Sequence, residues 1–260
     1  MVYLLLAFFG ILAGISSSLF GFGGGIIIVP LLYHLQNTNN PYAMHIAIAT
    51  STSIIIFNAL NSTYKHRQYI IWSMVHPIII YISIGSLIGV ALSSITNSIF
   101  LKWLFIVYLS YTIINSIYKK NFSTQTENKV VPISKIVQLV SGFLIGCLSV
   151  LLGIGGSIMT VPLMRKFGSN MKSAAAIANI LSIPIGLVGS IGYIISAYSK
   201  HISLGAEYLG FIYLPALVIL TATGFIGVSL GSFISHSIAE KLHAKIYIGL
   251  LILVLIFMVS

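Results

Sequence analysis

The chain has 260 residues, of which 58% are hydrophobic and only 6% are charged, and its formal net charge is +10. A soluble domain carries roughly a quarter charged residues, so this composition excludes a soluble globular protein and indicates a chain that uses lipid as its solvent. Backbone groups in lipid have to be satisfied within helices or a closed barrel, and the continuous apolar runs favour helices over alternating barrel strands. We therefore predict an all-α, polytopic helical membrane protein.

The net charge and the types of side chain present exclude several classes of function. Thirteen Lys and Arg residues outnumber three acids, and they occur in short loops between apolar runs, where basic residues set membrane topology. Nucleic-acid binding is therefore not expected. Cys147 is the only cysteine and aspartate is absent, so we expect no disulfide, no metal site and no cofactor. The sequence contains no P-loop, no nucleophile elbow at a strand-to-helix turn and no His-Glu-x-x-His motif, and an enzyme is not expected.

Eight apolar segments follow one another along the chain: 2–33, 43–62, 71–95, 103–118, 136–164, 174–198, 208–235 and 246–260. A membrane-crossing helix needs about 20 residues, so the short segments 103–118 and 246–260 are expected to extend into their flanks. Segments 2–33 and 136–164 are longer than one crossing requires, and glycines interrupt both of them.

The glycine interruption occurs twice. The stretch from Gly21 to Leu32, GFGGGIIIVPLL, returns from Gly153 to Met164 as GIGGSIMTVPLM, at a constant offset of 132 positions. We interpret this as an internal duplication, with a first membrane repeat over 1–118 and a second over 136–260. The polar stretch 119–135 is predicted to be a linker between them.

Each interrupted segment has two interpretations: one long bent crossing, or a hairpin that enters, turns at the glycines and leaves on the same side. With bent crossings the basic residues divide seven to six between the two sides, whereas with hairpins they divide eleven to two. Because basic residues concentrate on the cytoplasmic side, we favour re-entrant hairpins. Each repeat is then a glycine-broken hairpin plus three transmembrane helices, the second repeat is inverted, and both termini face out. Inverted repeats are typical of secondary transporters.

The glycine breaks are the main candidate site. A helix that restarts after them presents unpaired N–H groups and the positive end of its dipole, which bind anions. We predict that main-chain groups bind a small anion at Gly21, Gly23, Gly24 and Gly25, and at Gly153, Gly155, Gly156 and Ser157, with Pro30 and Pro162 in structural roles. The alternative is that the glycines only permit close helix packing. We assign that packing role to the pairs Gly85/Gly89 and Gly227/Gly231.

Polar residues that follow each hairpin are further candidates. Thr50, Ser51 and Asn179 are predicted to line the substrate site, because neutral hydroxyl and amide groups suit a partly dehydrated anion. His45 is the proton-coupling candidate, since histidine titrates near neutral pH. The histidines at 34, 66, 201, 236 and 243 are expected to be solvated loop residues.

The doubled Gly-x-Gly-Gly-[Gly/Ser]-x-x-x-Val-Pro pattern, followed by Ala49-Thr50-Ser51, resembles the sulfite exporter TauE/SafE family. The resemblance covers nearly the whole chain, but Ala178-Asn179-Ile180 departs from the Ala-Thr-Ser element in the second copy. It implies a permease of sulfite or an organosulfur anion. We expect an alternating-access transporter in the bacterial inner (plasma) membrane, with a cytoplasmic linker and a small anion as its partner. The alternatives are an anion channel or a non-transport scaffold, and the oligomeric state is left open.

Overall fold

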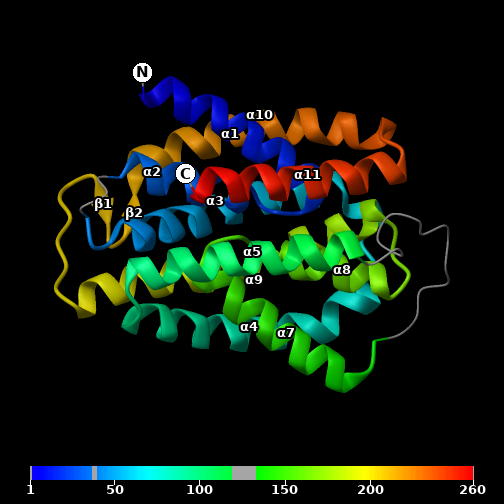
Figure 1. Ribbon diagram of the computed structural model, residues 1–260, viewed down its shortest axis with the longest axis horizontal. Helices are drawn as coiled ribbons and strands as arrows, with labels where there is room; N and C mark the ends of the chain where they lie inside the picture. Colours follow the sequence, from blue (N-terminus) through cyan, green and yellow to red (C-terminus); the bar gives the residue numbers. More distant parts are fainter. Residues whose placement is uncertain (1, 37–39, 119–132, 260) are drawn as a thin grey trace.

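The computed structural model describes residues 2–36, 40–118 and 133–259, and these residues form helices and one very short strand pair (Figure 1). The first half of the chain contains α1 (Val2–Phe20), α2 (Gly25–Leu35), α3 (Ala43–Lys65), the 3₁₀ turn η1 (Arg67–Tyr69), α4 (Trp72–Ile95) and α5 (Ser98–Tyr118). The second contains α7 (Lys135–Leu152), α8 (Ser157–Lys166), α9 (Met171–Ser199), strands β1 (Tyr208–Leu209) and β2 (Ile212–Tyr213), α10 (Leu214–Ser237) and α11 (Glu240–Val259). Most of the predicted linker 119–135 lies outside the described residues.

Eight of the described helices are long and apolar enough to cross a membrane, which confirms the predicted class. The short predicted segments do extend into their flanks, as α5 and α11. The number of spanning helices differs from the hairpin interpretation. The first arms of the hairpins, α1 and α7, also reach spanning length. Each half therefore has four helices of spanning length instead of three, because the glycines come only after the first arm has completed 18 or 19 helical residues.

The chain reverses direction at each break. Figure 1 shows α1 starting at the end of the molecule that carries β1 and β2, and α2 returning to that end. Tyr33 of α2 accordingly meets Lys102 at the start of α5, with the ammonium 5.0 Å from the ring centre. In the second half, α7 starts at the opposite end, and the residues after α8 return there, where Ser169 donates to Met74 Sδ of α4.

The helices pair reciprocally between the halves. α1 packs along α10, and its counterpart α7 packs along α4, while α3 pairs with α9 and α5 with α11. Glycines permit the closest of these contacts: a Cβ on Gly85 would lie 2.2 Å from the Phe143 carbonyl oxygen, and one on Gly227 would lie 2.1 Å from that of Ile11. The predicted packing role of these glycines is therefore confirmed.

Basic residues concentrate at one end of the bundle. Eight of the Lys and Arg residues in the described ranges are near the helix ends that lie opposite β1 and β2 in Figure 1: Lys65, Arg67, Lys135, Arg165, Lys166, Lys172, Lys241 and Lys245. Lys102 and Lys200 are near the other end, next to the strands. This distribution agrees with the hairpin interpretation, which places both chain ends on the side with few cations.

Candidate functional site at the two helix breaks

Glycine makes the two breaks possible. Gly21, Gly23 and Gly24 have φ values of 77°, 62° and 89°, and Gly153, Gly155 and Gly156 have values of 66°, 68° and 74°. Residues with a Cβ rarely adopt this left-handed conformation, whereas glycine does so without steric cost. Gly24 and Gly156 then occupy the position immediately before α2 and α8, so both short helices restart directly after the left-handed turn.

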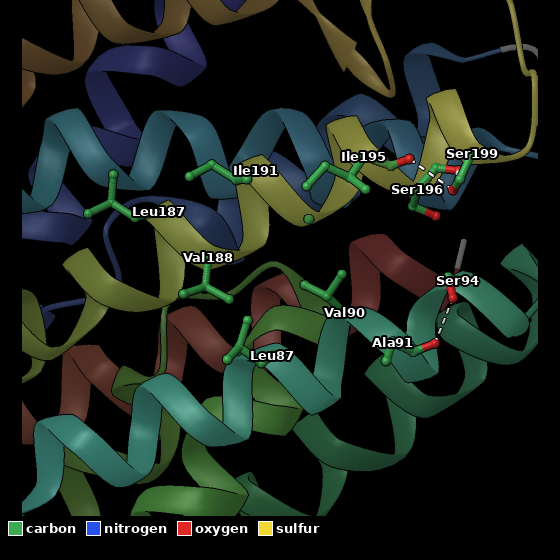
Figure 2. A pocket seen from close by; sticks show the side chains of 11 residues that line it. Leu87, Val90, Ala91, Ser94, Leu187, Val188, Ile191, Ile195, Ser196 and Ser199 are labelled. Carbon is green, nitrogen blue, oxygen red and sulfur yellow. Dashed lines mark hydrogen bonds between the residues drawn. The ribbon is translucent and has the colours of Figure 1, made fainter.

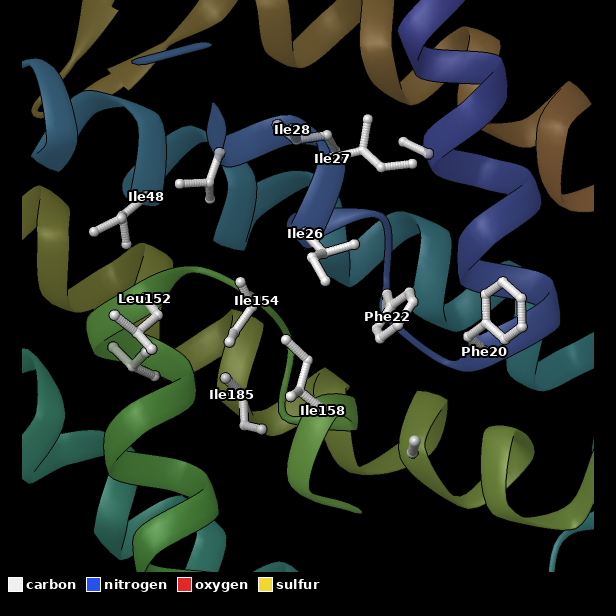
Figure 3. Packing of buried hydrophobic residues seen from close by; sticks show 14 of the residues in the cluster. Phe20, Phe22, Ile26, Ile27, Ile28, Ile48, Leu152, Ile154, Ile158 and Ile185 are labelled. Carbon is white, nitrogen blue, oxygen red and sulfur yellow. The ribbon is translucent and has the colours of Figure 1, made fainter. Parts of the chain in front are cut away.

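The two breaks touch each other inside the protein. A Cβ on Gly25 would lie 2.3 Å from the Gly153 carbonyl oxygen, and a Cβ on Gly155 would lie 2.8 Å from that of Phe22. Figure 3 shows Phe22, Ile26, Ile154 and Ile158 around the two turns. All residues from Gly21 to Pro30 and from Gly153 to Ile158 are buried, so the breaks are closed to solvent in this conformation.

Polar groups at the helix starts remain available for a ligand. Within the described part of the chain, the N–H groups of Gly24 and Ile26, and of Gly156 and Ile158, donate to no backbone carbonyl. The Ser157 side chain is completely buried, and its hydroxyl has no hydrogen-bond partner among these residues. Neither break contains a charged residue. Two sets of unpaired donors therefore meet in the interior without a cationic side chain.

Side chains of the long central helices hold the break backbone in place. Ser51 Oγ of α3 donates to the Gly153 carbonyl at 2.7 Å, so the first half supports the break of the second. Asn58 Nδ2 donates to the Gly23 carbonyl at 3.2 Å, and Ser182 Oγ of α9 donates to the Gly155 carbonyl. These three carbonyls of the breaks are in this way paired internally, whereas the N–H groups of Gly24, Ile26, Gly156 and Ile158 have no backbone partner among the described residues.

Asn179 supports the first break from the second half. Its Nδ2 donates to the Ser17 carbonyl at 3.0 Å and to Ser62 Oγ at 2.8 Å, and its Oδ1 accepts from Ser17 Oγ at 3.3 Å. The residue is fully buried. Its amide therefore ties the end of α1 to α3 and α9, which is the reciprocal of the bond from Ser51 to the second break.

We expect Asn179→Ala to lower the free energy of unfolding by about 1–3 kcal/mol, because it leaves the buried Ser17 carbonyl and Ser62 hydroxyl without this partner. Thermal unfolding of the purified protein in detergent measures the loss. Asn61→Ala is the matched control, since Asn61 lies on α3 next to Ser62 but is only partly buried. An unchanged unfolding temperature for Asn179→Ala would contradict the supporting role.

Thr50 and His45 form their hydrogen bonds with residues outside the breaks. Thr50 Oγ1 accepts from the Tyr213 N–H at 2.9 Å and so fastens β2 to α3. His45 is buried, with Nδ1 3.2 Å from Ser98 Oγ and Nε2 3.2 Å from the Ser93 carbonyl oxygen. These partners belong to the α4–α5 connection, at the end of the bundle that carries the strands.

Tyr247 is a residue near the site that the sequence analysis did not single out. Pro30 and Pro162 lie inside α2 and α8, and because proline has no N–H, the carbonyl four residues earlier loses its helical donor. For Pro162 that carbonyl belongs to Ile158, and the Tyr247 hydroxyl of α11 lies 3.4 Å from it. The Tyr247 ring also stacks on Phe22 in the first break, 5.3 Å between centres. A single tyrosine in an apolar run gives no sequence signal for this position.

The expectation of solvated loop histidines is wrong in part: His34 is exposed but belongs to α2, and two others are buried. His243 belongs to α11 and is buried, with Nε2 2.8 Å from the Leu19 carbonyl oxygen at the end of α1. His66 follows α3 and is also buried, with Nδ1 3.0 Å from the Ser62 carbonyl oxygen. Both are covered because helices from distant parts of the sequence pack over them.

Eight apolar helices of spanning length and a pair of broken hairpins define a polytopic helical membrane protein. The family model for sulfite exporter TauE/SafE matches residues 6–258. The chain therefore belongs to the TauE/SafE family, and the expected resemblance is confirmed.

Relatives with curated descriptions are named as probable membrane transporters, which supports the same class for this chain. A probable membrane transporter protein of Haemophilus influenzae is 34% identical over 86% of this chain and 85% of its own length. The probable membrane transporter protein YunE of Bacillus subtilis is 31% identical, over 76% of this chain and 80% of its own. The probable membrane transporter protein MJ0441 of Methanocaldococcus jannaschii is 28% identical over 94% of this chain and 90% of its own length. No solved structure matches the chain.

Proposed function

We propose that this transporter carries a small oxyanion, sulfite or an organosulfur anion, and binds it between the starts of α2 and α8. The observation that carries the proposal is the meeting of two helix starts whose N–H groups and Ser157 hydroxyl have no acceptor among the described residues. Buried donors without acceptors are costly, and a bound anion would satisfy them. The family takes its name from sulfite export, and sulfite is a small oxyanion.

The proposed mechanism is alternating access by two inverted repeats. α1 runs beside α10 and α7 beside α4, each pair joining helices of different halves. Since the break residues are buried, substrate entry requires movement of one half against the other, which favours a carrier over a permanently open channel. We assign the end rich in basic residues, and with it the linker 119–135, to the cytoplasm of a bacterial inner membrane, following the positive-inside rule. His45 remains the proposed proton-coupling residue, and no enzymatic activity is proposed.

Transport assays in right-side-out and inside-out vesicles test the proposal. We expect saturable uptake and counterflow of at least one of sulfite, thiosulfate, taurine and sulfoacetate. A pH gradient is expected to change the rate in the native protein but not in His45→Gln. Currents without counterflow would instead identify a channel, and no transport of any of the four anions would contradict the substrate class.

A further inference from the structure

A groove separate from the helix breaks lies between α4 of the first half and α9 of the second. It has a volume of about 450 Å³ and contains none of the residues proposed to bind the anion. Figure 2 shows its lining: Leu87, Val90, Ala91, Ser94, Leu187, Val188, Ile191, Gly192, Ile195, Ser196 and Ser199. Most of this lining is aliphatic, and the groove follows the direction of the two helices.

The side walls of the groove face lipid. Leu87, Ile191 and Ile195 are each more than half exposed in the isolated chain, and exposed aliphatic residues on spanning helices are covered by acyl chains. The floor is formed where the helices touch, since a Cβ on Gly192 would lie 2.4 Å from Val90 Cγ1. Outside this point of contact the helices leave an apolar channel open to the membrane.

One end of the groove is polar. Ser94, Ser196 and Ser199 gather there, at the right of Figure 2. The hydroxyls of Ser94 and Ser199 donate to carbonyls of their own helices. Ser196 is only 8% exposed, and its hydroxyl donates to no residue that the structure describes. The Ser196 hydroxyl, on a largely buried residue that lines the groove, is thus available to a ligand that supplies an acceptor.

The ammonium group of Lys200 lies at the same end of the groove. Lys200, the residue after α9, donates from Nζ to the Ser94 carbonyl and so bridges α9 and α4 at the mouth of the groove. An ammonium group has three donors, so two remain for another acceptor. Lys102 and Lys200 are the only Lys or Arg residues near this end of the bundle within the described ranges.

We propose that this groove is a binding site for an anionic glycerophospholipid. One acyl chain occupies the aliphatic part, the ester region meets Ser196, and the phosphate group lies against Lys200. Hydrocarbon in the groove and an anion at its mouth match the two chemistries that the lining offers. Because α4 and α9 belong to different halves, the bound lipid contacts both halves at once.

Native mass spectrometry of the full chain, released from nanodiscs that contain equal amounts of phosphatidylglycerol and phosphatidylcholine, tests the site. We expect retained phosphatidylglycerol in the native protein and about fivefold less in Lys200→Gln, since one basic residue near a membrane surface contributes about 1 kcal/mol to anionic lipid binding. Lys102→Gln is the matched control, because it removes the other cation at this end and should not change retention.

A second variant tests the apolar part without changing charge. Ala91 is exposed and lines the groove, so Ala91→Phe is expected to displace the acyl chain and lower retention of both lipids, while size-exclusion chromatography confirms that the protein is folded. Equal retention of the two lipids by the native protein, or equal losses in Lys200→Gln and Lys102→Gln, would overturn the proposal. These outcomes are independent of which anion is transported.

Discussion

Gly25→Ala is expected to lower the transport rate at least tenfold while the protein still inserts into the membrane. Gly25 is the first residue of α2 and its φ value is not positive, so alanine suits its backbone. The added methyl group would, however, lie 2.3 Å from the Gly153 carbonyl oxygen. Overpacking of this kind costs about 1–3 kcal/mol, and here the strain is relieved by moving the two breaks apart. Initial uptake rates in vesicles with matched protein amounts measure the effect.

Gly249→Ala in α11 is the matched control for Gly25→Ala. No atom lies within 4 Å of a Cβ added at Gly249, so transport should be unchanged by the same chemical substitution. Native transport by Gly25→Ala would show that contact between the breaks is not needed for transport.

Ser157→Ala is expected to weaken substrate binding about tenfold to a hundredfold without destabilising the protein. A hydrogen bond to a charged group contributes about 1.5–3 kcal/mol, which the variant would lose in the anion complex. In the absence of substrate the Ser157 hydroxyl is buried without a partner, and removal of such a group is neutral or stabilising. The half-saturating anion concentration measures the first effect, and thermal unfolding without anion measures the second.

The separation of these two effects is what identifies a ligand-binding hydroxyl. A purely structural serine would lower the unfolding temperature and leave the half-saturating concentration unchanged. Ser116→Ala is the control, since this hydroxyl on α5 is also buried without a partner among the described residues but lies outside both breaks. It should change neither substrate affinity nor stability.

The sequence by itself determined the membrane class, the helical fold, the two glycine breaks and the family. Each of these depends on composition or on local pattern: apolar runs of spanning length specify helices, and glycine clusters specify turns that other residues cannot adopt. The equal spacing of Gly21–Gly25 and Gly153–Ser157 was therefore sufficient to locate both breaks and the restart of each short helix.

Only the tertiary structure decided which groups meet at the breaks. The bonds from Ser51 to Gly153 and from Asn179 to Ser17 join residues more than 100 positions apart, and the same is true of the contact between Tyr247 and Phe22. Burial of His243 and His66 likewise results from helices packed over them, and the α4–α9 groove is lined by residues that are about 100 positions apart in the sequence. Such contacts depend on how the two halves pair in space, and no local periodicity or propensity encodes that pairing.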